Sequence, residues 1–188
     1  DFELFEALAS HTVESGFIRR FSAQMASYLA WAFAVARMDH VPLFDALAGF
    51  IAKHADTFEP QHVANCAWAY AAVGLDTPLA WGALAGAAKG GRLWSFSPQE
   101  LCALCWAFAQ ARWNDEELFL DMAQVASQRL DEFDGHGLAN FLSSVQGLWQ
   151  DLGDAPSRFR ELLNRTLDAA VSGRAPLDAD ALASVARS

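Results

Sequence analysis

The sequence predicts an all-α fold, an α-solenoid built from about four and a half helix-turn-helix repeats. One phrase that opens with Phe recurs at 21–38, 58–75, 96–113 and, more loosely, 133–150. The starts are separated by 37, 38 and 37 residues, and a fixed period in this range is typical of stacked supersecondary units. Apolar residues make up 53% of the chain and charged residues 19%, which is enough apolar material for a continuous core. We therefore expect a single helical-repeat domain over 1–188.

The first helix of each repeat, helix A, has a recurring start signal. Ser, Glu or Asp stands where an N-cap belongs, at Ser22, Glu59, Ser97 and Asp134, and Pro follows in two repeats. Residues 97–100 read Ser-Pro-Gln-Glu, a capping box in which Glu100 returns to the cap. We expect A helices near 22–37, 59–73, 97–112, 135–149 and 178–187.

The second helix, helix B, begins after a short turn. Pro42, Pro78, Asp115 and Pro156 mark its starts, while Gly74 and the pair at 90–91 mark stops. Residues 4–9 resemble residues 43–48, so the opening segment is predicted to be a B helix as well. We expect B helices near 3–14, 41–54, 77–88, 115–130 and 156–172, and a chain that begins and ends in mid-repeat.

A helical projection of 100° per residue divides helix A into sides. Val63, Cys66 and Tyr70 fall on one side, which is predicted to pack on helix B. The next side carries small residues around one Trp, a composition that suits close approach of helices. The Trp residues predicted to pack between repeats are Trp31, Trp68 and Trp106.

A narrow polar sector is left over on each A helix, and it holds the candidate binding residues. Amide side chains that bond base edges and an aromatic ring that stacks would suit unstacked RNA bases. The alternative is that these residues only solubilise the face, and the sequence leaves both open. The candidates for binding RNA or a protein partner are Gln24, Tyr28, Gln61, His62, Asn65, Gln99, Glu100, His136 and Asn140.

Composition and motifs limit the possible functions further. The formal net charge is −10, the wrong sign for a chain that grips phosphate backbones on its own. Cys66, Cys102 and Cys105 lie in predicted helix cores and lack the loop spacing of a zinc site, so no metal ligand and no cofactor is predicted. The five histidines are scattered, and no nucleophile elbow, P-loop or dinucleotide fingerprint occurs, so we predict no enzyme activity.

The repeat phrase resembles those of a known group of proteins. Phe-Glu-Pro-Gln at 58–61 and Phe-Ser-Pro-Gln at 96–99 are each followed by a helix containing Trp-Ala-Tyr or Trp-Ala-Phe. This is similar to the octotricopeptide and heptatricopeptide repeat proteins and the related FAST-kinase-like factors with RAP domains. The likeness is weakest at 133–150, where Ser143 replaces the Trp, and no RAP domain is present.

The resemblance implies an α-solenoid in a mitochondrion or plastid that takes part in organellar gene expression. Combined with the acidic charge, it suggests a non-catalytic scaffold of a large organellar complex, for example one associated with ribosomes, with protein subunits as partners. The alternative hypothesis is a sequence-selective factor that binds single-stranded or ribosomal RNA. No apolar segment approaches the roughly 20 residues that cross a bilayer, so a soluble organellar protein without a membrane span is expected.

Overall fold

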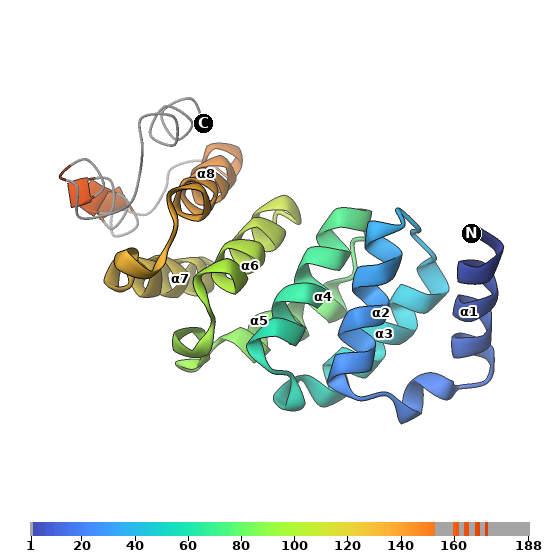
Figure 1. The fold of residues 1–188 in the computed structure, drawn as a ribbon. Helices are drawn as coiled ribbons and strands as arrows, with labels where there is room; N and C mark the ends of the chain where they lie inside the picture. Colours follow the sequence, from blue (N-terminus) through green and yellow to red (C-terminus); the bar gives the residue numbers. More distant parts are fainter. Residues whose placement is uncertain (1, 153–159, 162–163, 166–167, 170–171, 173–188) are drawn as a thin grey trace. The chain divides into compact units, whose positions relative to one another are not determined.

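The computed structural model describes residues 2–152, 160–161, 164–165, 168–169 and 172. Over these residues the regular structure is helical throughout, without a strand, and helices that are close in the chain pack together (Figure 1). The predicted all-α fold class is confirmed. The α-helices are α1 Phe2–Glu14, α2 Ala23–Val35, α3 Val41–His54, α4 Pro60–Val73, α5 Pro78–Ala88, α6 Pro98–Gln110, α7 Glu116–Gln128 and α8 Gly135–Leu152.

Two predicted helices fall on the last part of the chain. The helix expected at 178–187 lies outside the described residues. Of the helix expected at 156–172, the described residues 160–161, 164–165 and 168–169 are helical.

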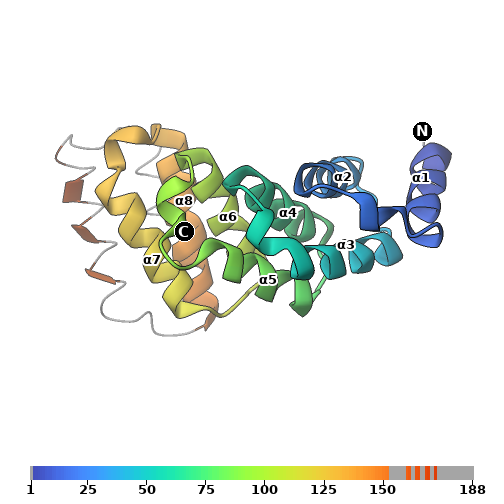
Figure 2. The ribbon, with the colours of Figure 1, turned by 90° about the horizontal axis from the view of Figure 1, so that it is seen from below.

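The chain divides into two compact units, an N-terminal unit of Asp1–Lys89 and a C-terminal unit of Gly90–Ser188. In the N-terminal unit, α2 packs on α4, α1 on α3, and α3 on α5. Figure 2 shows α2 and α4 in one layer of this unit and α3 and α5 in the other. In the C-terminal unit, α6 packs on α8 and on α7. Within each unit, A helices therefore stack on A helices, as in a solenoid, whereas a single domain over 1–188 stays a prediction.

Side chains cap the starts of the A helices. Ser22 Oγ accepts from the Met25 N–H of α2 at 3.2 Å, and Ser97 Oγ accepts from the Glu100 N–H of α6 at 3.3 Å. Before α8, Asp134 Oδ1 accepts from the Gly137 N–H at 2.6 Å. Each bond satisfies one of the N–H groups that a helix leaves without an internal partner. These caps explain why the repeat phrase begins each A helix at the same place.

The A helices α2, α4 and α6 end in the same backbone turn, at Arg37, Gly74 and Arg112. All three residues are left-handed, with φ of 56°, 71° and 51°. In α4 the Leu75 N–H reaches Tyr70 O and the Gly74 N–H reaches Ala71 O, the bonding pattern of a Schellman motif. The sequence predicted a stop at Gly74, but the arginines at the equivalent positions gave no such signal, because Gly is the residue that favours this conformation.

A short 3₁₀ helix precedes every described A helix, and no signal in the sequence predicts it. These turns are η1 Phe17–Arg20, η2 Ala55–Thr57, η3 Arg92–Ser95 and η4 Leu130–Glu132. The leading Phe of the repeat follows each turn in extended conformation. In the N-terminal unit, Phe50 of α3 lies between two of these rings, with centroid distances of 6.5 Å to Phe21 and 6.3 Å to Phe58. The leading Phe therefore anchors the loop between repeats to helix B.

Core contacts link successive helices of the repeat. Tyr70 of α4 is fully buried and donates its hydroxyl to Phe44 O of α3 at 2.6 Å. Its ring also lies 6.3 Å from Trp81 of α5, so it contacts the B helices on both sides. In the C-terminal unit, Cys102 Sγ approaches Gly137 O of α8 at 3.1 Å. Small residues on helix A thus let the backbone of the next A helix come close.

Candidate protein- or RNA-binding face

In the N-terminal unit, the polar candidates lie on two packed A helices, α2 and α4. Gln24 and Gln61 are exposed, and Asn65 is half-buried. Gln24 Nε2 lies 3.4 Å from the hydroxyl of Tyr28 one turn later, so these two exposed side chains form one local group. The amides are accessible to a ligand, but residues that only solubilise the surface would be exposed in the same way.

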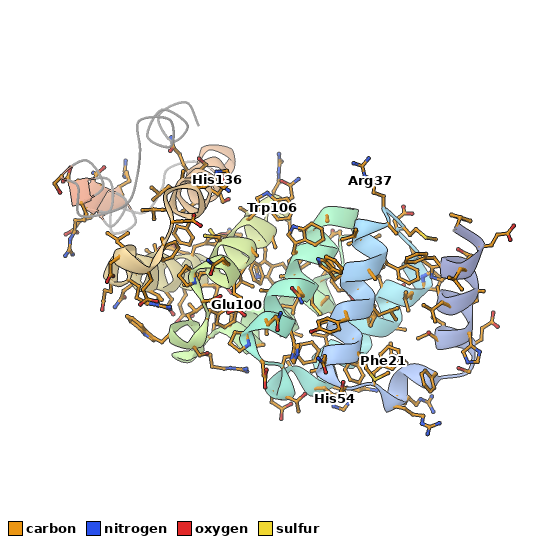
Figure 3. The ribbon with its side chains drawn as sticks, in the orientation of Figure 1. Phe21, Arg37, His54, Glu100, Trp106 and His136 are labelled. Carbon is orange, nitrogen blue, oxygen red and sulfur yellow. The ribbon has the colours of Figure 1, made fainter. Side chains whose placement is uncertain are left out.

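Two candidates are engaged in capping. His62 Nδ1 accepts from the Glu59 N–H at 3.2 Å, and Glu100 Oε2 accepts from the Ser97 N–H at 2.7 Å. Figure 3 shows Glu100 at the start of α6. Both side chains are half-buried and complete capping boxes. They therefore have a structural function that the sequence showed for Glu100 and that was missed for His62, because His is not the usual residue at this position of the box.

The C-terminal unit carries the remaining polar candidates on α6 and α8. Gln99, His136 and Asn140 are all exposed, and Figure 3 shows His136 on α8. Because α6 packs on α8, the three lie on neighbouring helices. The polar face was predicted to run along four A helices. In the structure its residues lie on two pairs of A helices, one pair in each unit.

The three Trp residues predicted to pack between repeats differ in exposure. Trp68 and Trp106 are half-buried, whereas 47% of the surface of Trp31 is exposed. The repeat assigns the three residues one role, but the surroundings of the three rings differ. Trp31 thus offers a large aromatic surface to solvent.

Trp31 belongs to a group of exposed apolar residues that sequence reasoning missed. We call this group the α2 apolar face; it consists of Met25, Tyr28, Trp31 and Val35, which are spaced by three, three and four residues along one side of α2. Exposed apolar side chains gathered along one side of a helix are typical of interaction sites in folded proteins.

The three cysteine thiols are poorly reactive. Burial raises the pKa of Cys66 and Cys105 well above the usual value of a thiol, and it raises the pKa of Cys102 to about 12, with the Asp134 carboxylate adding to the effect. A thiol must lose its proton to act as nucleophile or metal ligand. Over the described part of the chain, no group of three or more His, Cys, Asp or Glu side chains is placed to hold a metal ion.

Within the described residues, no helix is both long enough and apolar enough to cross a membrane. A comparison with protein-family models finds no match, and a comparison with curated proteins finds no relative.

Proposed function

We propose that this protein is a non-catalytic helical-repeat scaffold that binds other protein subunits of a large organellar complex, such as one associated with ribosomes. The observation that carries the proposal is the α2 apolar face, because half-exposed Tyr28 and Trp31 are residue types that anchor protein interfaces. The resemblance of the repeat phrase to those of organellar gene-expression factors supports the organellar part.

The charge of the chain supports protein in preference to nucleic acid. Acidic residues number 23 and basic residues 13, for a formal net charge of −10. Affinity for a phosphate backbone comes mainly from Lys and Arg that neutralise phosphates. The polar candidate residues include no Lys or Arg that would serve this purpose.

Purification of the tagged chain from gently lysed organelles tests the proposal. We expect defined protein subunits to co-purify in constant proportion. Recovery of a folded monomer free of other proteins would contradict a scaffold function.

A sequence-selective RNA-binding factor is the second candidate. Exposed Gln24, Gln61, Gln99, His136 and Asn140 favour it, because their side chains suit hydrogen bonds to base edges. A gel-shift series with organellar transcripts at low salt tests this candidate. Tight binding that is lost in a Gln61→Ala, Gln99→Ala double variant would favour RNA, and no shift at any transcript would exclude it.

A further inference from the structure

A basic surface lies in the N-terminal unit, where the turn η1 packs on α1 and α3. Arg19 and Arg20 form the second half of η1 and are exposed, as is the ring of Phe17 at its start. The last turns of the two helices add the exposed imidazoles of His11 in α1 and His54 in α3. We call these five residues the η1 basic surface.

Ring contacts join the three elements into one surface. The Phe17 centroid lies 6.4 Å from that of His11 and 5.8 Å from that of Phe21. Phe21 lies 6.5 Å from Phe50, and Phe50 lies 4.5 Å from His54. Figure 3 shows Phe21 and His54 at the same end of the N-terminal unit. The series of rings therefore runs without a break from the end of α1 across η1 to the end of α3.

The two arginines are held by the turn and not by carboxylates. The Arg20 guanidinium lies 5.7 Å from the centroid of the Phe17 ring, a cation–π contact. Gly16 has a φ of 65°, and a Cβ there would lie 3.9 Å from Arg19 Nε, so the Arg19 side chain extends back over this turn. Within the described residues, neither guanidinium forms an ion pair. Their N–H groups are therefore accessible to an anionic ligand.

The Lys and Arg residues of this unit are concentrated at this end, with three of the five in η1 or in the last turn of α3. The five are Arg19, Arg20, Arg37, Lys53 and Lys89. The exposed carboxylates nearest to them in the sequence here are Glu14 and Asp56, which are fewer than the three cations. The end of the unit thus keeps a positive charge in a chain with a formal net charge of −10.

The fold of the turn does not explain the arginine pair. All four inter-repeat turns are 3₁₀ helices, whatever residues stand just before the leading Phe. These pairs are Arg19-Arg20, Asp56-Thr57, Trp94-Ser95 and Asp131-Glu132. Since an acidic pair forms the same turn as a basic pair, the cations at η1 are available for a function other than folding.

Charge complementarity gives the η1 basic surface an acidic partner, and the magnitude of the charge favours protein over nucleic acid. Nucleic-acid binding that depends on charge involves about 6–10 phosphate contacts, more than three cations provide. A long phosphate backbone would also meet the remaining acidic surface of the chain. An acidic protein segment carries its charge over a short length, and the guanidinium fork of Arg matches a carboxylate in two parallel hydrogen bonds.

We propose that the η1 basic surface binds an acidic segment of a partner protein. The inference rests on the proposed scaffold function and names the chemistry of one partner. Arg19 and Arg20 would pair with carboxylates of the segment, and the exposed Phe17 ring would contact an apolar side chain between them.

Fluorescence anisotropy with a labelled synthetic peptide tests the inference. The probe has about 12 residues, Asp or Glu at most positions and one Phe. We expect saturable binding by the intact chain that weakens as salt is added. The double variant Arg19→Gln, Arg20→Gln should bind about tenfold more weakly, because it loses two ion pairs of the exposed kind.

The matched control is Arg37→Gln, Lys89→Gln, which removes the same charge from the same unit outside the η1 basic surface. Its affinity should stay close to that of the wild type at physiological salt, where exposed charges more than about 8 Å apart are screened. Circular dichroism checks that both double variants are folded. No binding of the peptide, or equal loss in the two double variants, would overturn the inference.

Two further measurements test the class of partner. A single-stranded RNA of about 12 nucleotides should bind more weakly than the peptide, and tighter binding that depends on Arg19 and Arg20 would assign the surface to nucleic acid and overturn the inference. Sedimentation that shows self-association, lost in Arg19→Gln, Arg20→Gln, would overturn it too, by assigning the surface to the acidic residues of a second copy.

Co-purification separates this inference from the function beneath it. If the same organellar subunits purify with Arg19→Gln, Arg20→Gln as with the wild type, the scaffold function stands and the docking inference fails. If no subunit purifies with the wild type, the scaffold proposal fails, whatever the peptide does.

Discussion

Three A helices end in the same backbone conformation, which Gly supplies in one repeat and Arg in two. Arg37, Gly74 and Arg112 occupy the same repeat position and share positive φ. Figure 3 shows the Arg37 side chain extending beyond the end of α2. An L-residue in the left-handed region costs about 1 kcal/mol relative to Gly, so the two arginines hold a turn that Gly would form more easily.

Gly74→Ala is expected to lower the free energy of unfolding by about 1 kcal/mol. The cost comes from the backbone alone, since a Cβ at Gly74 would meet no atom within 4 Å. The matched control is Gly82→Ala within α5, where the Cβ is equally free of contacts. There Ala should raise stability by about 1 kcal/mol, because it is the better helix former. Urea denaturation measures the free energy of unfolding of both variants. A change of the same sign in the two would contradict the backbone cost assigned to Gly74.

Tyr70→Phe is expected to destabilise the protein by about 1 kcal/mol, through loss of the buried bond to Phe44 O. Tyr28→Phe is the control, because Tyr28 is 46% exposed and its hydroxyl has only the 3.4 Å contact with Gln24. It should unfold at the same urea concentration as the wild type. Equal stability of both variants would show that the Tyr70 bond contributes nothing.

The buried thiols predict a pH dependence at the alkaline side. Burial raises the pKa of Cys66 and Cys105 in the folded state, whereas the thiols of an unfolded chain have a pKa of about 8.5. Their contribution to stability is therefore fully present below that pH and is lost as the pH rises above it. The urea concentration at the midpoint of unfolding should be lower at a pH above the thiol range than at neutral pH. This decrease should be smaller in Cys66→Ala. A thiol reagent at pH 8 should leave Cys66 and Cys105 unmodified until the chain unfolds.

At the scale of elements, the sequence predicts more about helix starts than about helix ends. N-cap residues and Pro carry a local signal, so the observed α4 at Pro60–Val73 lies close to the predicted 59–73. The left-handed arginines and the four 3₁₀ turns were not predicted, because Arg and the turn sequences have no distinctive local preference. Exposure of Trp31 was missed for another reason. It depends on what surrounds the ring in the folded chain, which the pattern within one repeat does not contain.

Arg129 joins two elements of the C-terminal unit. Its Nη1 donates to Phe96 O at 2.7 Å, and its Nη2 donates to Glu132 at 2.6 Å. It thereby ties the end of α7 to the loop that precedes α6. The same hydrogen bond lowers the pKa of Glu132.

Arg129→Ala is expected to cost about 1–3 kcal/mol, because a partly buried carbonyl loses a charged donor. Glu132→Gln should cost clearly less, since it removes only an exposed ion pair and leaves the bond to Phe96 O. Its effect should vanish in acid, where the carboxylate is protonated and no longer contributes. Thermal unfolding of the two variants provides the comparison, and a larger loss in Glu132→Gln would contradict the role given to Arg129.

At the scale of the whole molecule, acidic charge and exposed apolar surface point to a protein partner, and exposed amides point to RNA. The repeat period predicted the all-α class, because the period depends only on the stacking of like units. The candidate face was predicted only as a set of exposed polar positions. Which partner covers an exposed surface depends on groups outside the chain, so neither its identity nor its class follows from the repeat.

Tyr28 allows one direct test, because it is a candidate RNA reader and also lies on the α2 apolar face. A photoreactive phenylalanine analogue at position 28 would capture whatever lies against the face in intact organelles, with position 94 as the control. We predict a crosslink to a protein helix that position 94 does not give. A crosslink from position 28 to RNA, without protein, would contradict the scaffold function.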